Sequence, residues 1–390
     1  MRHIYLRNKA KEPGNSLKHS LLDYNDFFSS LLFNIKENGF DPYKSIPLSK
    51  DGGILNGAHR ISAAMALGLK KIPVVLSKEE RGVDRDINWF INRGFNSHEI
   101  HELIYNWVLS SFCKPYIAIL WQTVYDHWEQ IVSDISGKVD IVFSKTMSFD
   151  SVGLQEFIKD VYSFEQPADF SVKITNKAEV LVNCGCAVKV LLLDNKNGFC
   201  GVVKNYIREK YCHLFAYDPL FIIHVSDTVD EMYHMNSMLF HYENSIFLQN
   251  RSVALTDDIA RWIKELKLIL EKLSLSSSDV CAVGGAVLNI YGLKKADDLD
   301  VAVTKKIRKE KFSDSAECIG DNVDIVAKDY FRTIGYSVSD DSLIYDRSMF
   351  VYVRGLKFAD IDVVRKRKMF SLRDKDLKDL ALIGDYYVKK

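Results

Sequence analysis

The stretch Asn56-Gly57-Ala58-His59-Arg60 decides how the first part of this 390-residue chain folds. It follows a short apolar segment at 45–49 and a Gly-Gly turn, and it opens an alanine-rich segment at 61–67. Residues 71–76 then have the composition of a second strand. A glycine at the start of a helix lets backbone amides approach an anion, and the helix dipole favours negative charge there. The order of strand, glycine turn, helix and strand therefore predicts a phosphate site.

The candidate nucleotide-binding residues of this motif are Asn56, Gly57, His59 and Arg60. Arg60 falls in the first helical turn, where its guanidinium can contact phosphate in a bidentate manner. The pattern resembles the ParB/sulfiredoxin fold over about residues 20–80. The resemblance implies a segment that holds nucleotide phosphates, as in the members of that family that are small-molecule kinases. Asn56 stands where family members often carry Asp, which argues against an acid–base role. An ordinary strand–turn–helix with a buried alanine face is the alternative interpretation.

The composition predicts a folded protein of two to four domains. Apolar residues make up 47% of the chain, and 52 basic residues balance 52 acidic ones. A dedicated DNA-binding protein usually has a basic excess, so nucleic acid is not an expected partner. The sequence has neither an apolar run long enough for a membrane span nor a signal-peptide core. Its seven cysteines, an odd number mostly within apolar runs, favour reduced thiols and a cytoplasmic location.

A second motif lies in the last third of the chain. Val283-Gly284-Gly285-Ala286 opens a predicted helix, and Asp298-Leu299-Asp300 then begins a predicted strand. Alternation along a strand puts Asp298 and Asp300 on the same side. Two convergent carboxylates suit Mg²⁺, and the amides of a Gly-Gly turn can bind triphosphate oxygens. We therefore take the two aspartates as metal ligands, and Gly284 and Gly285 as nucleotide-binding residues.

This pattern resembles the nucleotidyltransferase superfamily that includes DNA polymerase β. The resemblance implies three carboxylates and two metal ions for in-line attack on an α-phosphate, with the third carboxylate on a later strand. Asp324 and Asp362 are the candidates for that position. Residues 356–380 look like the tail of minimal nucleotidyltransferases, in which the segment around Asp362 leads into a helix. We therefore assign Asp298, Asp300 and Asp324 as catalytic and metal-binding residues. Lys294 or Lys295 replaces the usual Arg before the Asp-x-Asp pair.

The predicted fold class is α/β and α+β multidomain. We expect a ParB/sulfiredoxin-like domain at 1–95, a helical segment at 96–137, a mixed α/β domain at 138–252 and a nucleotidyltransferase-like domain at 253–390. The helical segment is predicted from aromatic spacing that continues through Trp121. In the mixed domain, Glu243 to Ser245 are expected to precede a short strand. His224 and Asp227 are either a catalytic pair or a structural histidine beside a helix cap.

Together the motifs predict a Mg²⁺-dependent phosphotransfer enzyme that uses ATP or another nucleoside triphosphate. The front module would act as a kinase on a small hydroxyl compound, and the rear module would transfer a nucleotidyl group. Residues 224–250 resemble segments of bacterial surface-polysaccharide proteins, which implies a sugar or polyol substrate. The alternatives are a nucleotide-sensing regulatory protein, an abortive-infection-type nucleotidyltransferase toxin, and a nucleic-acid-binding adaptor, which the neutral charge disfavours.

Overall fold

The structure is a computed structural model that describes residues 20–80, 86–111, 114–164, 170–195, 200–214, 218–333, 336–371 and 373–389. The chain has a mixed α/β, multidomain fold and divides into two compact units, Met1–Asn96 and Ser97–Lys390. The boundary between them is next to the one expected at residue 95, whereas the positions 137 and 252 fall inside the second unit. Within the described parts of the chain, no helix is long and apolar enough to cross a bilayer.

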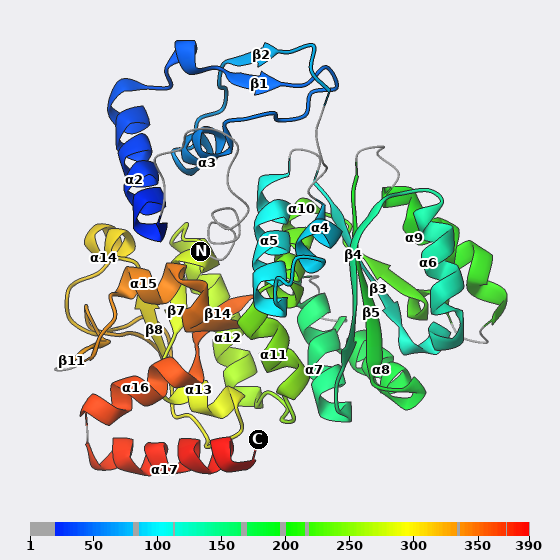
Figure 1. The fold of residues 1–390 in the computed structure, drawn as a ribbon. Coiled ribbons are helices and arrows are strands. Elements are labelled where there is room, and N and C mark those ends of the chain that lie inside the picture. Colours follow the sequence, from blue (N-terminus) through cyan, green and yellow to red (C-terminus); the bar gives the residue numbers. More distant parts are fainter. Residues whose placement is uncertain are drawn as a thin grey trace. The chain divides into compact units, whose positions relative to one another are not determined.

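The first unit contains two packed helices and a two-stranded parallel sheet (Figure 1). Its elements are α2 (Leu21–Asn38), β1 (Ile46–Leu48), α3 (Ala58–Ala66), β2 (Val74–Leu76) and α4 (Ile87–Ile91). The bounds of helix α2 are set by local signals, because Ser20 and Asp23 form a capping box at its start and Gly39, at a φ of 76°, ends it. In the sheet, Ile46 is opposite Val74.

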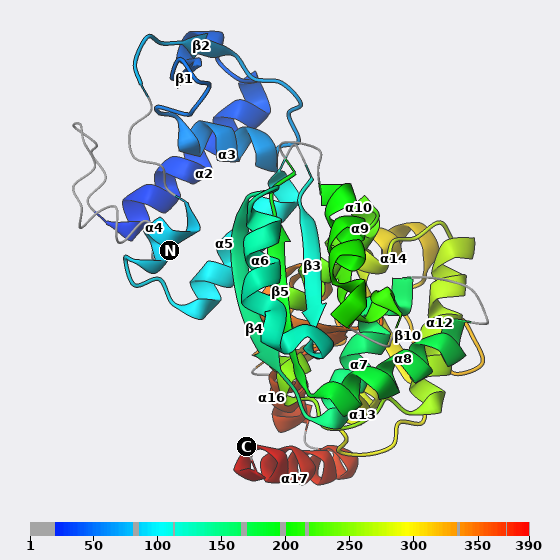
Figure 2. The same cartoon turned by 90° about the vertical axis from the view of Figure 1, so that its right-hand side faces the viewer.

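The second unit begins with an antiparallel sheet in the order β4-β5-β3-β6. Its strands are β3 (Tyr116–Trp121), β4 (Ile141–Ser148), β5 (Ala187–Leu193) and β6 (Ile223–Val225). Helices α6 (Trp128–Ser136) and α9 (Cys200–Tyr211) cover one face and share a core with Leu120 and Leu193. Helices α5 (Ser97–Ser110), α7 (Ser151–Val161) and α10 (Val229–Leu239) lie on the other face (Figures 1 and 2), and α8 (Phe170–Cys184) packs on α7.

Two secondary-structure predictions for this region are wrong. The segment 96–137, expected to be helical, contains β3, a central strand in which Ile119 and Trp121 are fully buried. A continuous apolar run that is buried on both faces has no period that separates strand from helix. Glu243 to Ser245 precede no strand, because they belong to helix α11 (Tyr242–Asn250). The His241 side chain caps that helix by accepting a hydrogen bond from the Asn244 amide, and histidine is not among the usual capping residues.

A second, mixed sheet has the order β13-β14-β7-β8-β10-β9. Its strands are β7 (Val280–Ala282), β8 (Leu299–Val303), β9 (Glu317–Cys318), β10 (Val323–Ile325), β13 (Phe350–Val353) and β14 (Leu356–Ala359). The accompanying helices are α12 (Asp257–Lys272), α13 (Gly285–Ile290), α14 (Lys305–Lys311), α15 (Asp340–Tyr345), α16 (Ile361–Ser371) and α17 (Asp374–Lys389). A small pair, β11 (Arg332–Thr333) and β12 (Tyr336–Ser337), stands apart. Because α11 packs on both α7 and β13, the two sheets of this unit share one set of helices.

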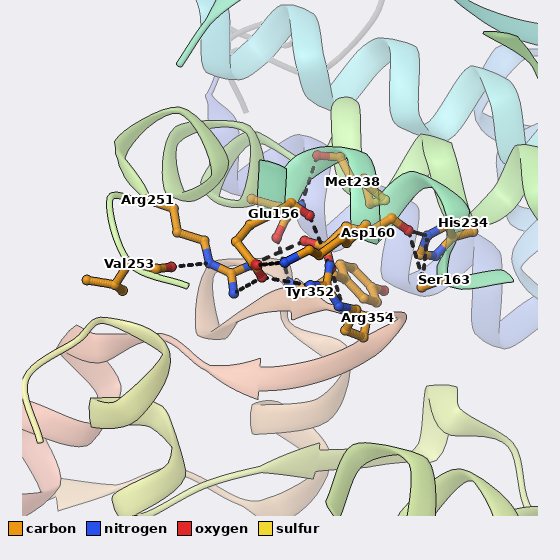
Figure 3. A network of polar contacts seen from close by, with 11 residues as sticks. Glu156, Asp160, Ser163, His234, Met238, Arg251, Val253, Tyr352 and Arg354 are labelled. Carbon is orange, nitrogen blue, oxygen red and sulfur yellow. Dashed lines mark hydrogen bonds and ion pairs between the residues drawn. The ribbon is translucent and has the colours of Figure 1, made fainter. Parts of the chain in front are cut away.

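A buried network of charges joins these two parts (Figure 3). Glu156 and Asp160 of α7 face Arg251, which follows α11, and Arg354, which lies in the turn between β13 and β14. The Arg251 guanidinium is 2.9 Å from Glu156 and 3.3 Å from Asp160, and the Arg354 guanidinium is 2.7 Å and 2.5 Å from the same two carboxylates. The side chains of Glu156, Asp160 and Arg251 are each 1% exposed. Two guanidinium groups thus neutralise two carboxylates away from solvent, and the partly exposed Lys159 adds a further contact to Glu156 at 2.9 Å.

The network also fixes the backbone of the hairpin. Arg354 has a φ of 50° and Gly355 a φ of 78°, as a two-residue hairpin turn requires. A residue with a side chain is disfavoured in this left-handed region by about 1–2 kcal/mol. The Arg354 amide donates to Asp160 at 2.9 Å, which holds the turn in place. Burial alone would raise the pKa of Glu156, but Arg354, Arg251 and Lys159 outweigh it, so the pKa lies below its usual value.

Replacing Arg251 with Met should destabilise the second unit strongly. The substitution removes the most deeply buried cation of the network, so Glu156 and Asp160 keep only the more exposed Arg354 and Lys159 as partners. Breaking a buried ion pair costs about 3–5 kcal/mol. Urea unfolding followed by circular dichroism measures the loss. The matched control is Arg261→Met, which removes an exposed pair with Asp258 and should cost at most about 1 kcal/mol. Equal losses for the two variants would show that the network adds no special stability.

Candidate functional site

The pairing of β8 with β10 brings acidic residues together. The two strands run parallel, with Asp300 opposite Asp324. Asp298 immediately precedes β8, two residues before Asp300. Side chains directly opposite on neighbouring strands are close, because such strands are about 4.8 Å apart. Three sequence-predicted site residues therefore gather at one place on the second sheet.

These carboxylates repel one another. Burial, together with the charges of Asp298 and Asp324, raises the pKa of Asp300 to about 6. The pKa of Asp298 is also raised, by burial and then by Asp324 and Asp297. Carboxylates held at a site where each disfavours ionisation of the next are typical of functional sites, because repulsion of this kind weakens the fold.

Gly284 lies directly against this acidic group. It precedes α13 with a φ of 67°, and a Cβ built on it would be 2.4 Å from the Asp300 carboxylate. The Val283 amide donates to the Asp300 carbonyl at 2.8 Å, which ties the glycine turn to β8. A Cβ on Gly285 would contact nothing closer than 4.0 Å. Gly284 is thus required by the close approach of Asp300, whereas the space beside Gly285 is free of close neighbours.

The donor set fits a hard divalent cation in its chemistry. Three carboxylates are the ligands that Mg²⁺ prefers, and their mutual repulsion is the kind that a bound cation relieves. Among the described residues, however, no group of three or more His, Cys, Asp or Glu side chains is arranged to hold a metal ion. Asp298, Asp300 and Asp324 therefore do not converge at ligand distance in this conformation, and rotation of their side chains would be needed.

The lysines expected to contact phosphate are engaged elsewhere. Lys294 lies 2.8 Å from Asp379, and Lys295 lies 3.1 Å from Asp258. Asp379 also accepts from Lys368 at 2.7 Å, within a buried group that joins α16 to α17. The ion pairs of Asp379 with Lys294 and Lys368 thus have a structural role, and we call this group the clasp.

The other candidate for the third carboxylate has a different setting. Asp362 lies in the first turn of α16 and contacts Arg365 at 3.1 Å and Tyr387 at 2.7 Å. Helix α16 follows β14, which is separated from β8 by β7. This carboxylate is therefore satisfied by its own helices and lies on a different part of the sheet from Asp300.

Two cations that sequence analysis did not single out act on the acidic group. Lys375 of α17 and Arg367 of α16 lower the pKa of Asp300 and so partly offset its burial. The Arg367 guanidinium is 3.7 Å from the centre of the Tyr330 ring and donates to the Tyr330 carbonyl at 3.0 Å. Their positions depend on how α16 and α17 pack on the sheet, and no local sequence pattern indicates that packing.

The first unit presents its glycine motif at the start of α3. Gly57 is the N-cap residue, with a φ of 97°, and no side chain caps the helix. A Cβ on Gly57 would lie 2.6 Å from Ile46, so β1 approaches too closely for any other residue. The Asn56 side chain accepts from the Gly57 amide at 2.6 Å. The helix start thus keeps backbone donors for an anion, as a phosphate site requires.

The other two residues of this motif have structural contacts. The Arg60 guanidinium donates to the carbonyls of Lys44 and Ser45, the latter at 3.3 Å. These bonds use one terminal nitrogen, and the other would be 3.0 Å from a Cβ on Gly57. The His59 ring packs on α2, with its centre 6.1–6.3 Å from three aromatic rings, those of Tyr24, Phe27 and Phe28. Gly57 and Arg60 are therefore together at the helix start, whereas the His59 side chain faces α2.

His224 does not pair with Asp227. Its Nε2 atom is 3.0 Å from Glu231, and Asp227 instead contacts Lys204 at 2.6 Å. The His224 side chain is 2% exposed, and burial lowers its pKa. This histidine is a buried structural residue beside the start of α10, which is the second of the two interpretations considered.

A comparison with models of known protein families finds no match for this chain. A comparison with curated protein sequences likewise finds none.

Asp300→Asn should remove the response of the protein to Mg²⁺ without weakening the fold. The substitution relieves the repulsion described above, so the melting temperature without divalent ions should not fall. A ligand that binds only the folded state raises the melting temperature as its concentration increases, and this Mg²⁺-dependent rise should be lost. Differential scanning fluorimetry over a Mg²⁺ titration measures both effects. Asp362→Asn is the control and should respond to Mg²⁺ as the unmodified protein does; loss of the response in both variants would contradict the assignment.

Proposed function

We propose that the second unit, Ser97–Lys390, is a Mg²⁺-dependent nucleotidyltransferase that uses a nucleoside triphosphate. The observation that supports it best is the parallel register of β8 and β10, which sets Asp300 beside Asp324 and against Gly284. A pure scaffold has no need for three repelling carboxylates next to a glycine turn. The resemblance of this motif to the DNA polymerase β superfamily supports the same proposal.

The roles of the residues follow from their chemistry. Asp298, Asp300 and Asp324 would hold Mg²⁺, which, when bound, neutralises charge on the phosphates. Gly284 and Gly285, having no side chains, allow triphosphate oxygens to reach backbone amides. Lys375 and Arg367 face the same acidic group and supply positive charge toward a leaving pyrophosphate. The clasp of Lys294, Lys368 and Asp379 keeps α16 and α17, and hence those two cations, in position.

We further propose that the first unit binds the phosphates of ATP or a similar donor and acts as a small-molecule kinase. The specific observation is the uncapped start of α3, where Gly57 has a left-handed backbone and Arg60 is held at the same point. The carbonyls of Lys44 and Ser45 fix one side of the guanidinium, so the remaining donors are preorganised. The acceptor class, a sugar or polyol of surface-polysaccharide synthesis, rests on the resemblance of residues 224–250 alone.

Asp300→Asn and Asp324→Asn should each abolish nucleotidyl transfer. The assay is mass spectrometry of ATP or CTP incubated with the protein, Mg²⁺ and a panel of sugars and polyols. Loss of one preorganised electrostatic contact costs at least about 100-fold in rate. Asp362→Asn is the matched control and should retain activity.

The other outcomes of this assay decide between the alternatives. Stoichiometric nucleotide binding without product would indicate a sensor. Growth arrest on expression, relieved by Asp300→Ala, would indicate a toxin. Transfer that survives both Asp300→Asn and Asp324→Asn would refute the site.

Arg60→Ala should weaken nucleotide binding by the first unit at least tenfold, since a hydrogen bond to a charged group contributes about 1.5–3 kcal/mol. Binding is measured by calorimetry in an Asp300→Asn background, in which the nucleotide site of the second unit should no longer bind. The control is Lys36→Ala, which removes an exposed cation on α2. Circular dichroism checks that the loss of the Lys44 and Ser45 contacts has not unfolded the unit. Distant sites normally behave additively, so Arg60→Ala should leave nucleotidyl transfer intact. Loss of both activities in a folded protein would instead show one composite active site.

A further inference from the structure

A cavity of about 430 Å³ lies in the second unit, apart from the acidic group. Side chains from α5, from the start of α11 and from the turn that precedes β13 line it, among them Glu102, His241, Glu243 and Arg347. Its volume is at the lower end of the range for small-molecule sites, about 300–1,000 Å³. The cavity is therefore large enough for a small metabolite.

The charge of this cavity argues against a phosphorylated ligand. Arg347, its cation, is already paired: the guanidinium lies 2.8 Å from Glu102 and 2.9 Å from Asn106. It also lies 4.1 Å from the centre of the Tyr105 ring. Two further carboxylates line the cavity, those of Glu243 and Asp346. The net charge of the lining side chains is therefore negative, and a negative electrostatic potential repels phosphate groups.

His241 forms part of the wall of this cavity. Its side chain is 1% exposed, and its Nδ1 atom accepts from the Asn244 amide at 3.2 Å, which places the proton of the neutral ring on Nε2. Burial lowers the pKa of His241 to about 4, so the ring is neutral at pH 7. A backbone hydrogen bond with Arg347 acts on this pKa in the opposite direction, and Nε2 is itself buried. The ring therefore adds no charge to the cavity.

The remaining lining offers acceptors and ring surfaces. Glu243 is half-buried, and its pKa is raised by burial and by the nearby charges of Asp360 and Asp362. The His98 and Tyr242 rings meet edge to face, with their centres 4.8 Å apart. Carboxylates accept hydrogen bonds from hydroxyl groups, and the rings provide apolar contact for C–H faces. A neutral molecule rich in hydroxyl groups brings its own donors and matches this set of acceptors and ring surface.

We propose that this cavity binds an uncharged polyhydroxylated molecule, of the sugar or polyol class. Its place in the fold suits an acceptor site. Asp360, which acts on Glu243, follows β14, and β14 runs parallel to β7, which leads to Gly284. The carboxyl ends of parallel neighbours share one edge of a sheet, so Asp360, and with it the cavity residue Glu243, lies toward the edge that carries Gly284 and Asp300. This role as acceptor site rests on the proposed nucleotidyltransferase function, whereas binding itself does not.

Saturation-transfer NMR on the full chain, without nucleotide or divalent ions, tests binding directly. The probes are glucose, ribitol and glucose 1-phosphate. Glucose or ribitol should give a saturable signal, and glucose 1-phosphate should bind at least about tenfold more weakly, the effect of one contact to a charged group. Absence of binding by both neutral probes, or preference for the phosphate, overturns the proposal.

Variants locate the binding. Glu243→Gln should weaken the binding of glucose or ribitol. Glu243→Lys should abolish that binding and strengthen the binding of glucose 1-phosphate. Glu271→Gln, an exposed glutamate on α12, is the matched control and should change nothing. Unchanged binding in Glu243→Lys would place the probe elsewhere and overturn the proposal.

The test separates this inference from the proposed function. Asp300→Asn should keep sugar or polyol binding and lose transfer. Binding in a protein that shows no transfer with any acceptor would leave the cavity assignment standing and refute the transferase. If transfer occurs and Glu243→Lys leaves the KM for the acceptor unchanged, the transferase proposal stands and the cavity assignment is refuted.

Discussion

The arrangement of the second unit depends on the buried ion pairs among Glu156, Asp160, Arg251 and Arg354. Each guanidinium contacts both carboxylates, so the carboxylates are neutralised where water is excluded. These residues come from α7, from the end of α11 and from the β13–β14 turn, which are distant in sequence. An ion group of this kind is tolerated only when every member is present. It therefore joins the two sheets within one compact unit.

The charges near the proposed catalytic site follow the opposite rule. In the clasp of α16 and α17, Lys368 meets both Asp376 and Asp379 at 2.9 Å and 2.7 Å. Asp298 and Asp300, by contrast, are raised in pKa by burial and by neighbouring carboxylates. Paired charges hold the sheet and its helices in place. Like charges instead lie next to one another at the start of β8, beside Gly284. This contrast is the physical reason for placing function at the acidic group rather than at the larger ion networks.

Local signals in the sequence predicted those parts of the fold that depend on neighbours in the chain. The bounds of helix α2 follow from a local cap and a terminal glycine, and β5 coincides with a run of mostly apolar residues. Strand β3 was missed because a run that is buried on both faces has no informative period. The Gly284 turn and the pairing of Asp300 with Asp324 follow the motif spacing. The partner of Lys294, the cations opposite Asp300 and the lining of the cavity could not be predicted, because they arise from contacts between remote segments.

The turn at Arg354 restricts how this chain can diverge in evolution. The left-handed φ of 50° favours glycine, but glycine has no charge to offer Glu156 and Asp160. Lysine keeps the charge but lacks the planar fork that contacts both carboxylates. No single replacement meets both demands, so positions 156, 160, 251 and 354 are expected to covary among homologues. Their joint retention in a distant sequence would identify the same two-sheet unit even where the acidic motif has been lost.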